Sequence, residues 1–114
     1  MHWKHLEKLA EREVAETVRE LPPPLRERLK EVPVLLEDVP SPEDISTGIE
    51  ADTLGYFDED AGGLLRIRLW LENIWDFSDG DEDIYLDEVR TTLLHEIGHL
   101  VGWDEDDVED RGLG

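Results

Sequence analysis

Apolar residues recur three and four positions apart through the first part of the chain, which predicts an amphipathic helix over residues 3 to 20. The apolar stripe consists of Trp3, Leu6, Leu9, Ala10, Val14, Thr17, Val18 and Leu21. Pro22, Pro23 and Pro24 end this helix, because proline cannot continue it. Leu25 to Lys30 are expected to form a second, short helix behind the last proline.

The middle of the chain carries shorter patterns that are typical of strands. Val32 to Val39 is an apolar run that is too short for a helix, and Pro40 ends it. Ser41 to Asp52 is polar and is expected to form a loop. A further short strand is predicted around Leu54 to Phe57.

A longer strand is predicted at Leu64 to Leu71, and the turn Asp58 to Gly63 joins it to the preceding one as in a hairpin. Side chains in a strand alternate between the two faces of the sheet. One face is expected to carry Ile67, Leu69 and Leu71, and the other Arg66, Arg68 and Trp70.

The last third of the chain predicts one long helix. Asn73 to Asp83 is acidic and rich in turn-forming residues, so we expect a loop that contains a helical turn. Asp83 can then cap a helix that runs to about Gly102, before an acidic tail over Asp104 to Gly114. Helices and strands together predict a single α+β domain over residues 1–114.

Composition narrows the chemistry. The 114 residues include no cysteine, so a tightly held transition metal must be bound by histidine and carboxylate side chains. Thirty-one acidic against eleven basic residues give a net charge of −20, which argues against nucleic acid or an anionic membrane surface as a partner. The charged N-terminal segment lacks the apolar run of a signal peptide, and we expect a soluble, cytoplasmic protein.

The segment that carries chemistry is His95-Glu96-Ile97-Gly98-His99, an H-E-x-x-H pattern on the predicted long helix. Residues four apart on a helix lie one above the other, so the imidazoles of His95 and His99 can bind one zinc ion. The carboxylate of Glu96 can then reach a water molecule on that metal and accept its proton. Two surface histidines without metal are the alternative interpretation.

The position of the motif on the helix favours a metal site. At about 100° per residue, the broad apolar face of the helix lies nearly opposite His95 and His99. That face consists of Val89, Leu93, Ile97, Leu100 and Val101. The core can therefore be packed by one side of the helix while the histidines project into a polar cleft.

A third ligand is expected just beyond the helix. Gly102 can adopt a left-handed conformation and turn the chain back beneath the metal, and Glu105 follows three residues later. A carboxylate there completes three protein ligands and leaves one position open, as a catalytic zinc site requires. Four neighbouring carboxylates are alternatives for this role: Asp104, Asp106, Asp107 and Glu109.

The stretch Val89 to Gly114 resembles the C-terminal half of the bacterial mini-zincins, a group of small zincin-like metallopeptidases. The resemblance implies a minimal zincin fold, in which a three- to four-stranded sheet packs on an active-site helix and a supporting N-terminal helix. It also implies that His95 and His99 bind zinc and that Glu96 is the catalytic base. The family places an aspartate at the third ligand position, where this sequence has Glu105.

The function that follows is zinc-dependent hydrolysis of a peptide or protein substrate, with neither nucleic acid nor membrane as partner. By analogy with larger zincins, Leu64 to Leu71 is predicted to be the sheet edge that pairs with the peptide. The alternative is a zinc-binding module without catalytic turnover, or an inactive relative. A calcium loop at Asp79 to Asp83 is set aside, because the segment lacks the spacing of the glycine and terminal glutamate in an EF-hand loop.

Overall fold

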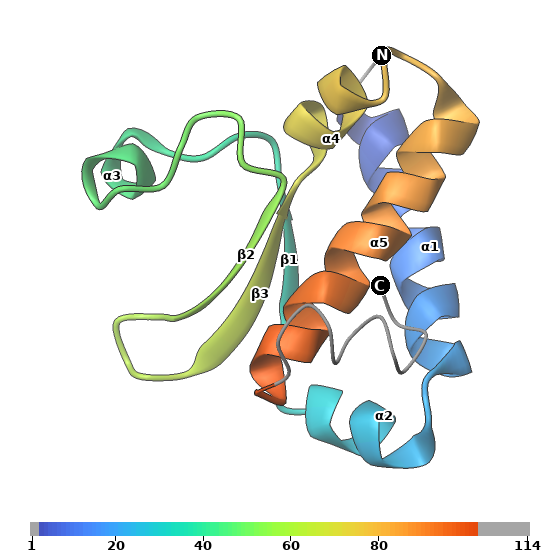
Figure 1. Ribbon diagram of the computed structural model, residues 1–114, viewed down its shortest axis with the longest axis vertical. Coiled ribbons are helices and arrows are strands. Elements are labelled where there is room, and N and C mark those ends of the chain that lie inside the picture. The colour runs from blue at the N-terminus through green and yellow to red at the C-terminus, as the bar shows by residue number, and fades with distance from the viewer. Residues whose placement is uncertain (1–2, 103–114) are drawn as a thin grey trace.

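Residues 3–102 are described by the computed structural model, and within them a small mixed sheet carries its helices mainly on one face (Figure 1). The first helix, α1 (Trp3–Glu20), and the second, α2 (Pro23–Leu29), follow the predicted pattern. Pro22 stands immediately before α2 with φ −55° and ψ 146°, and the next prolines occupy the first helical positions, where a missing N–H costs no hydrogen bond.

The sheet within the described residues has three strands, β1 (Val34–Glu37), β2 (Gly55–Glu59) and β3 (Leu65–Trp70), in the order β1-β3-β2. β1 pairs with β3 in parallel, and β2 pairs with β3 antiparallel. The predicted α+β fold with a small sheet is thus confirmed. The prediction that Leu64 to Leu71 forms an edge was wrong, because β1 and β2 both pair with this strand and make it central.

The predicted turn between β2 and β3 is present. The Asp60 side chain accepts hydrogen bonds from the backbone N–H groups of Gly62 at 2.8 Å and Leu64 at 3.0 Å. Gly63 has φ +82°, a left-handed conformation that favours glycine. These contacts close the hairpin that the sequence indicated.

Two helices follow β3. The first, α4 (Leu71–Phe77), begins directly after the strand, where a loop from Asn73 had been expected. Burial explains the difference, since Leu71 and Ile74 are fully buried and give the segment an apolar helical side. The second helix, α5 (Glu82–Leu100), is capped by the Asp81 side chain, which accepts from the Ile84 N–H; the predicted cap, Asp83, lies inside the helix.

α5 is the central helix of the molecule. It contacts β2 and β3 on one side, α1 on the other and α4 near its beginning (Figure 1). The hydroxyl of Tyr85 in α5 donates to the backbone carbonyl of Leu6 in α1 at 2.8 Å. This helix therefore has its position set by the sheet and by α1 together.

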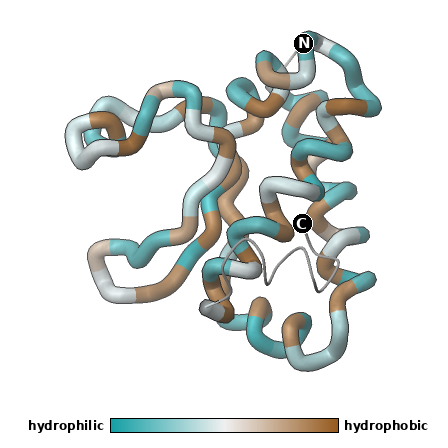
Figure 2. The backbone as a smooth tube through the Cα atoms, in the orientation of Figure 1, coloured by the Kyte–Doolittle hydropathy of each residue, from teal (hydrophilic) through white to brown (hydrophobic). Residues whose placement is uncertain are grey.

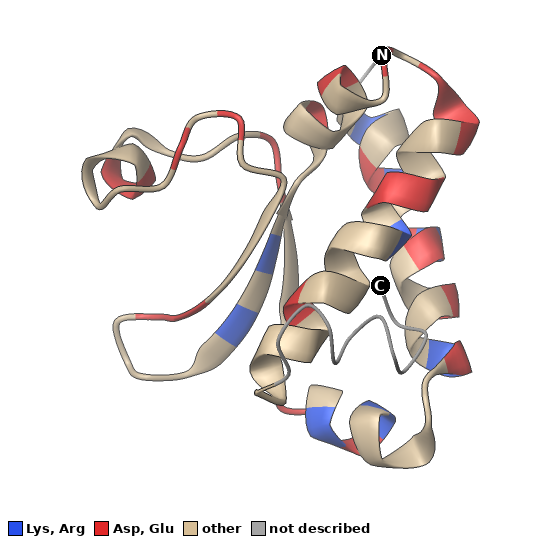
Figure 3. Ribbon diagram, in the orientation of Figure 1, with Lys and Arg blue, Asp and Glu red and all other residues tan. Residues whose placement is uncertain are grey.

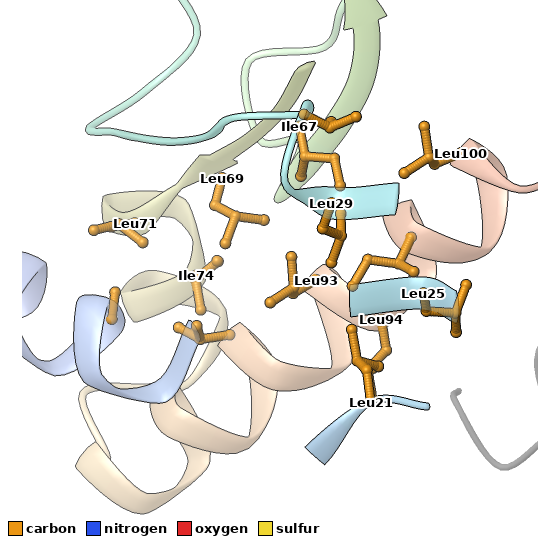
Figure 4. Close-up of a cluster of buried hydrophobic side chains, with 14 of the residues drawn as sticks. Leu21, Leu25, Leu29, Ile67, Leu69, Leu71, Ile74, Leu93, Leu94 and Leu100 are labelled. Atoms are coloured by element: carbon orange, nitrogen blue, oxygen red, sulfur yellow. The ribbon is translucent and has the colours of Figure 1, made fainter. Parts of the chain in front are cut away.

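The core lies between the sheet and the helices. Ile67 and Leu69 of β3, Ile74 of α4 and Leu93 of α5 are fully buried and meet there (Figure 4). Hydrophobic and hydrophilic positions alternate along β3, which can be followed in Figure 2. The predicted division of β3 into two faces is thus confirmed for its inner face.

The outer face of the sheet carries an ionic cluster around Arg68, whose side chain is only 6% exposed. Its guanidinium donates to Glu37 of β1, to Asp44 and, at 3.5 Å, to Asp58 of β2. It also lies 4.9 Å from the centre of the Trp70 ring. Both arginines of this strand therefore pair with the chain's own acidic side chains. Figure 3 shows few basic positions among many acidic ones.

A second helix also lies where a loop had been expected. The expected polar loop Ser41 to Asp52 contains α3 (Pro42–Ser46), which begins with a capping box. Ser41 Oγ accepts from the Asp44 N–H at 3.1 Å, and the Asp44 carboxylate accepts from the Ser41 N–H at 2.8 Å. The Arg68 guanidinium holds the pKa of the Asp44 carboxyl well below its usual range, so this short helix is bound to the sheet by a charged pair.

Candidate metal centre

The H-E-x-x-H motif lies in the last two turns of α5, on the side of the helix that does not pack in the core. Val89, Leu93 and Ile97 are fully buried, whereas His95 and Glu96 are half-buried and His99 is exposed. The predicted orientation of the helix is therefore the observed one. The apolar face packs inward, and the motif faces the space beside the sheet.

The two histidine rings lie close together. Their centres are 5.9 Å apart, with an angle of 62° between the ring planes. Four residues of helix rise by about 6 Å, so this separation follows from the backbone itself. α5 holds the two rings one above the other on one side.

This pair of donors is compatible with zinc. Zn–N bonds of about 2.0–2.1 Å in a tetrahedral site bring the centres of two bound imidazole rings to roughly 5 Å from each other. The observed 5.9 Å differs from that value by an amount that small side-chain rotations can supply. Imidazole nitrogen is also a donor that zinc prefers.

The third ligand cannot be placed in the same way. Glu105 and the four alternative carboxylates lie outside the described residues 3–102. Within that range, no group of three His, Asp or Glu side chains gathers as a metal site would need. Within the described residues, α5 ends at Leu100, and Gly102 adopts the expected left-handed conformation with φ +80°.

The carboxyl group of Glu96 lies between protein and solvent. Burial raises its pKa, while the neighbouring His99 and His95 act in the opposite direction. A carboxyl group with a raised pKa is a stronger base when it is ionised. The position of Glu96 beside the two imidazoles therefore suits a group that accepts a proton.

A cavity of about 450 Å³ lies between α5 and β2. Its lining consists of Gly55, Tyr56, Phe57, Glu96 and His99. The sequence analysis assigned no site role to the three β2 residues. The available signal was a glycine inside a predicted strand, which often marks a close approach of another backbone or a ligand.

β2 contributes a free edge to this cavity. Within residues 3–102 its only strand partner is β3, on its other side. The Trp70 N–H donates to the Leu54 carbonyl at 2.9 Å, so alternation along the ladder directs the backbone groups of Tyr56 toward β3 as well. The N–H and C=O groups of Gly55 and Phe57 consequently point away from β3, along the edge that the cavity follows.

Four other aromatic or histidine side chains lie away from the H-E-x-x-H motif. Trp70 is fully buried and packs beside Tyr56 on the outer face of the sheet. Trp75 packs against Tyr85, with ring centres 5.7 Å apart, whereas Phe77 is 60% exposed. His5 lies 3.6 Å from Glu82, far along α5 from the motif.

A comparison with known proteins identifies the family of the chain. The chain belongs to the zincin-like metallopeptidase family, because that family's sequence model matches residues 29–113. The match includes the strands, the cavity residues and the H-E-x-x-H helix. No curated protein matches the chain.

Among the helices of residues 3–102, none combines the length and the apolar character that a membrane crossing requires. α1 and α5 are long enough to be considered but carry charged residues throughout.

Proposed function

We propose that this protein is a zinc-dependent peptidase that uses His95 and His99 as metal ligands and Glu96 as general base. Glu105 is the proposed third ligand. The observation that carries the proposal is the shared cavity, in which the Glu96 carboxylate and an imidazole of the motif lie opposite the free backbone edge of β2. Membership of a metallopeptidase-like family, whose members normally bind zinc, supports the same function.

The chemistry divides between the metal and the chain. A zinc ion in this site supplies Lewis-acid chemistry, which lowers the pKa of water and polarises a carbonyl group. The imidazoles of His95 and His99 must be neutral to act as ligands. The Glu96 carboxylate accepts a proton from the attacking water and later donates it to the leaving amine.

The substrate backbone is expected to bind along β2. An extended peptide can add to a sheet edge as a new strand, and main-chain hydrogen bonds then supply much of its affinity. The outward-directed groups of Gly55 and Phe57 are the proposed partners. A peptide bound in this way would have a carbonyl group next to Glu96 and His99. The proposed peptide-binding edge is thus β2, in place of the strand Leu64 to Leu71.

The second candidate is a zinc-binding module without turnover. It is favoured by the glutamate at position 105, where the family has aspartate, because the longer side chain changes the geometry of the third ligand. Against it stands Glu96, since a structural zinc site closes its fourth position with a side chain and needs no base.

The two candidates are separated by Glu96→Gln. The amide keeps nearly the same volume and leaves both imidazoles in place, so zinc should still bind. The general-base contribution, about 10²–10⁴-fold in rate, should be lost. Zinc content and hydrolysis of unstructured peptides are measured for the parent and the variant. Glu88→Gln is the matched control, because it makes the same change on α5 roughly 12 Å before Glu96 along the helix axis.

Glu105→Ala completes the experiment. Loss of a ligand should lower zinc affinity and hydrolysis together. Hydrolysis that survives in Glu96→Gln would end the catalytic proposal. Zinc binding without any hydrolysis by the parent would favour the binding module, and zinc retained by Glu105→Ala would move the third ligand to one of the neighbouring carboxylates.

A further inference from the structure

β2 approaches α5 more closely at Gly55 than any side chain would allow. A Cβ atom placed on Gly55 would lie 2.6 Å from the Thr92 Cγ2 atom. It would also lie 3.2 Å from the Arg68 carbonyl oxygen and 3.2 Å from the Leu69 Cδ2 atom. Non-bonded carbon atoms pack at about 3.5–4.0 Å, so the contact with Thr92 is the one that glycine alone permits.

Neither the Thr92 side chain nor the Arg68 carbonyl group can easily move to make room for a Cβ atom at position 55. Thr92 is 7% exposed, and threonine in a helix has few rotamers because its Cβ carries two heavy atoms. The Arg68 carbonyl belongs to β3, whose backbone pairs with strands on both sides. A side chain at position 55 would therefore move β2 away from α5 by about 1 Å, to restore ordinary contact distances.

The contact lies one helical turn before the motif. From Thr92 to Glu96 the helix rises by about 6 Å, and from Gly55 to Phe57 the strand rises by roughly 6.6 Å. The two elements thus advance nearly in step along the cavity, which Gly55 and Phe57 line on the β2 side and Glu96 lines on the α5 side. A change in the separation of β2 and α5 at Gly55 and Thr92 would therefore also change the separation between the edge of β2 and the Glu96 carboxylate.

We propose that the Gly55–Thr92 contact is a positioning contact that sets the separation between the peptide-binding edge of β2 and the Glu96 carboxylate. The inference rests on the proposed function for its catalytic meaning. Neither residue needs to touch the reacting atoms. Gly55 acts by its missing side chain, and Thr92 acts by the methyl group that meets it.

The first test is Gly55→Ala. A displacement of about 1 Å between a bound substrate and a catalytic group costs up to roughly 10²-fold in rate. We expect kcat for peptide hydrolysis to fall by about 10- to 100-fold, while KM changes little because the outward backbone groups of β2 are retained. Zinc content should stay at the parental level, since both histidines belong to α5.

The second test is compensation at position 92. Thr92→Ser removes the Cγ2 atom, whereas Thr92→Val keeps it and replaces only the hydroxyl. In combination with Gly55→Ala, the serine substitution should restore kcat to within about fivefold of Thr92→Ser alone, and the valine substitution should not. Gly62→Ala is the matched control, because a Cβ at Gly62 would meet only the Asp60 side chain, at 3.4 Å.

A structural readout separates this inference from the proposed function. Nuclear Overhauser contacts between protons of β2 and protons of α5 should weaken in Gly55→Ala and return in Gly55→Ala with Thr92→Ser. If the parent cleaves no peptide, the proposed function fails while these contacts still test the spacing. Parental kcat and unchanged contacts in Gly55→Ala would overturn the inference, as would equal impairment of the serine and valine double variants. If Gly55→Ala alone does not fold, the two double variants decide.

Discussion

Arg68→Met tests the ionic cluster that binds α3 and β1 to the outer face of the sheet. The Arg68 side chain is 6% exposed, and it donates hydrogen bonds to Glu37 at 3.0 Å and to Asp44 at 2.9 Å. Methionine has a similar length but leaves these carboxylates without their cation. Loss of one partner of a buried ion pair costs about 3–5 kcal/mol of unfolding free energy. We expect the lower end, about 3 kcal/mol, since Glu37 is 33% exposed and keeps contact with water.

The effect should depend on pH in a defined direction. The pKa of Asp44 lies well below its usual range in the folded protein. Its contribution to stability is therefore fully present above about pH 3.9, the unfolded value, and declines progressively as the pH falls from there toward the lowered folded value. In Arg68→Met the cation is missing, and protonation of the crowded carboxylates relieves their repulsion. The difference between parent and variant should therefore shrink on acidification.

The assay is urea unfolding followed by tryptophan fluorescence, at pH 7 and at about pH 3.5. Arg66→Met is the matched control on the same strand. Arg66 pairs with Asp58 at 2.7 Å but its side chain is 27% exposed, and we expect a loss of about 1 kcal/mol or less. An Arg68→Met penalty equal to that of the control, or one that is the same at both pH values, would refute the reasoning.

Two further predictions concern stability. Tyr85→Phe removes the hydroxyl that donates to the Leu6 carbonyl at 2.8 Å, so the free energy of unfolding should fall by about 0.5–1.5 kcal/mol in urea titrations. Burial raises the pKa of Tyr85, so the parent should also lose stability above about pH 10 in a way that the variant does not. The net charge of −20 predicts a melting temperature that rises from low to moderate salt, because screening relieves self-repulsion over a Debye length of about 10 Å at 0.1 M; a flat or falling curve in scanning calorimetry would contradict it.

Much of the local structure could be predicted because single segments decide it. The apolar stripe of α1 and the alternation along β3 are properties of contiguous residues, and both elements lie where the pattern indicated. The orientation of α5 was predictable for the same reason. One broad apolar face leaves only one side for His95 and His99.

Other features depend on contacts that no single segment reveals. α3 is only five residues long, and its Asp44 has a distant partner in Arg68. The central place of β3 depends on β1, which is far from it in sequence and pairs with it in parallel. The edge strand was therefore assigned wrongly, and the cavity wall formed by Gly55 to Phe57 was not recognised.

The candidate site was predictable only in the part that one helix carries. His95, Glu96 and His99 lie together on α5 because their spacing equals one helical turn. Their assignment as ligands and base stays a prediction, as does that of Glu105. The close approach of β2 to α5 at Gly55 could be found only from the folded structure, because Gly55 and Thr92 are far apart in the sequence.

The zinc content of the purified protein tests the central claim most directly. Elemental analysis is carried out on the full chain and on the double variant His95→Ala with His99→Ala, after equal exposure to zinc and removal of loosely bound metal. The account predicts about one zinc ion per chain in the parent and nearly none in the variant, because the remaining carboxylate cannot hold the ion alone. A parent that binds no zinc, or a double variant that keeps it, would contradict the metal centre on α5.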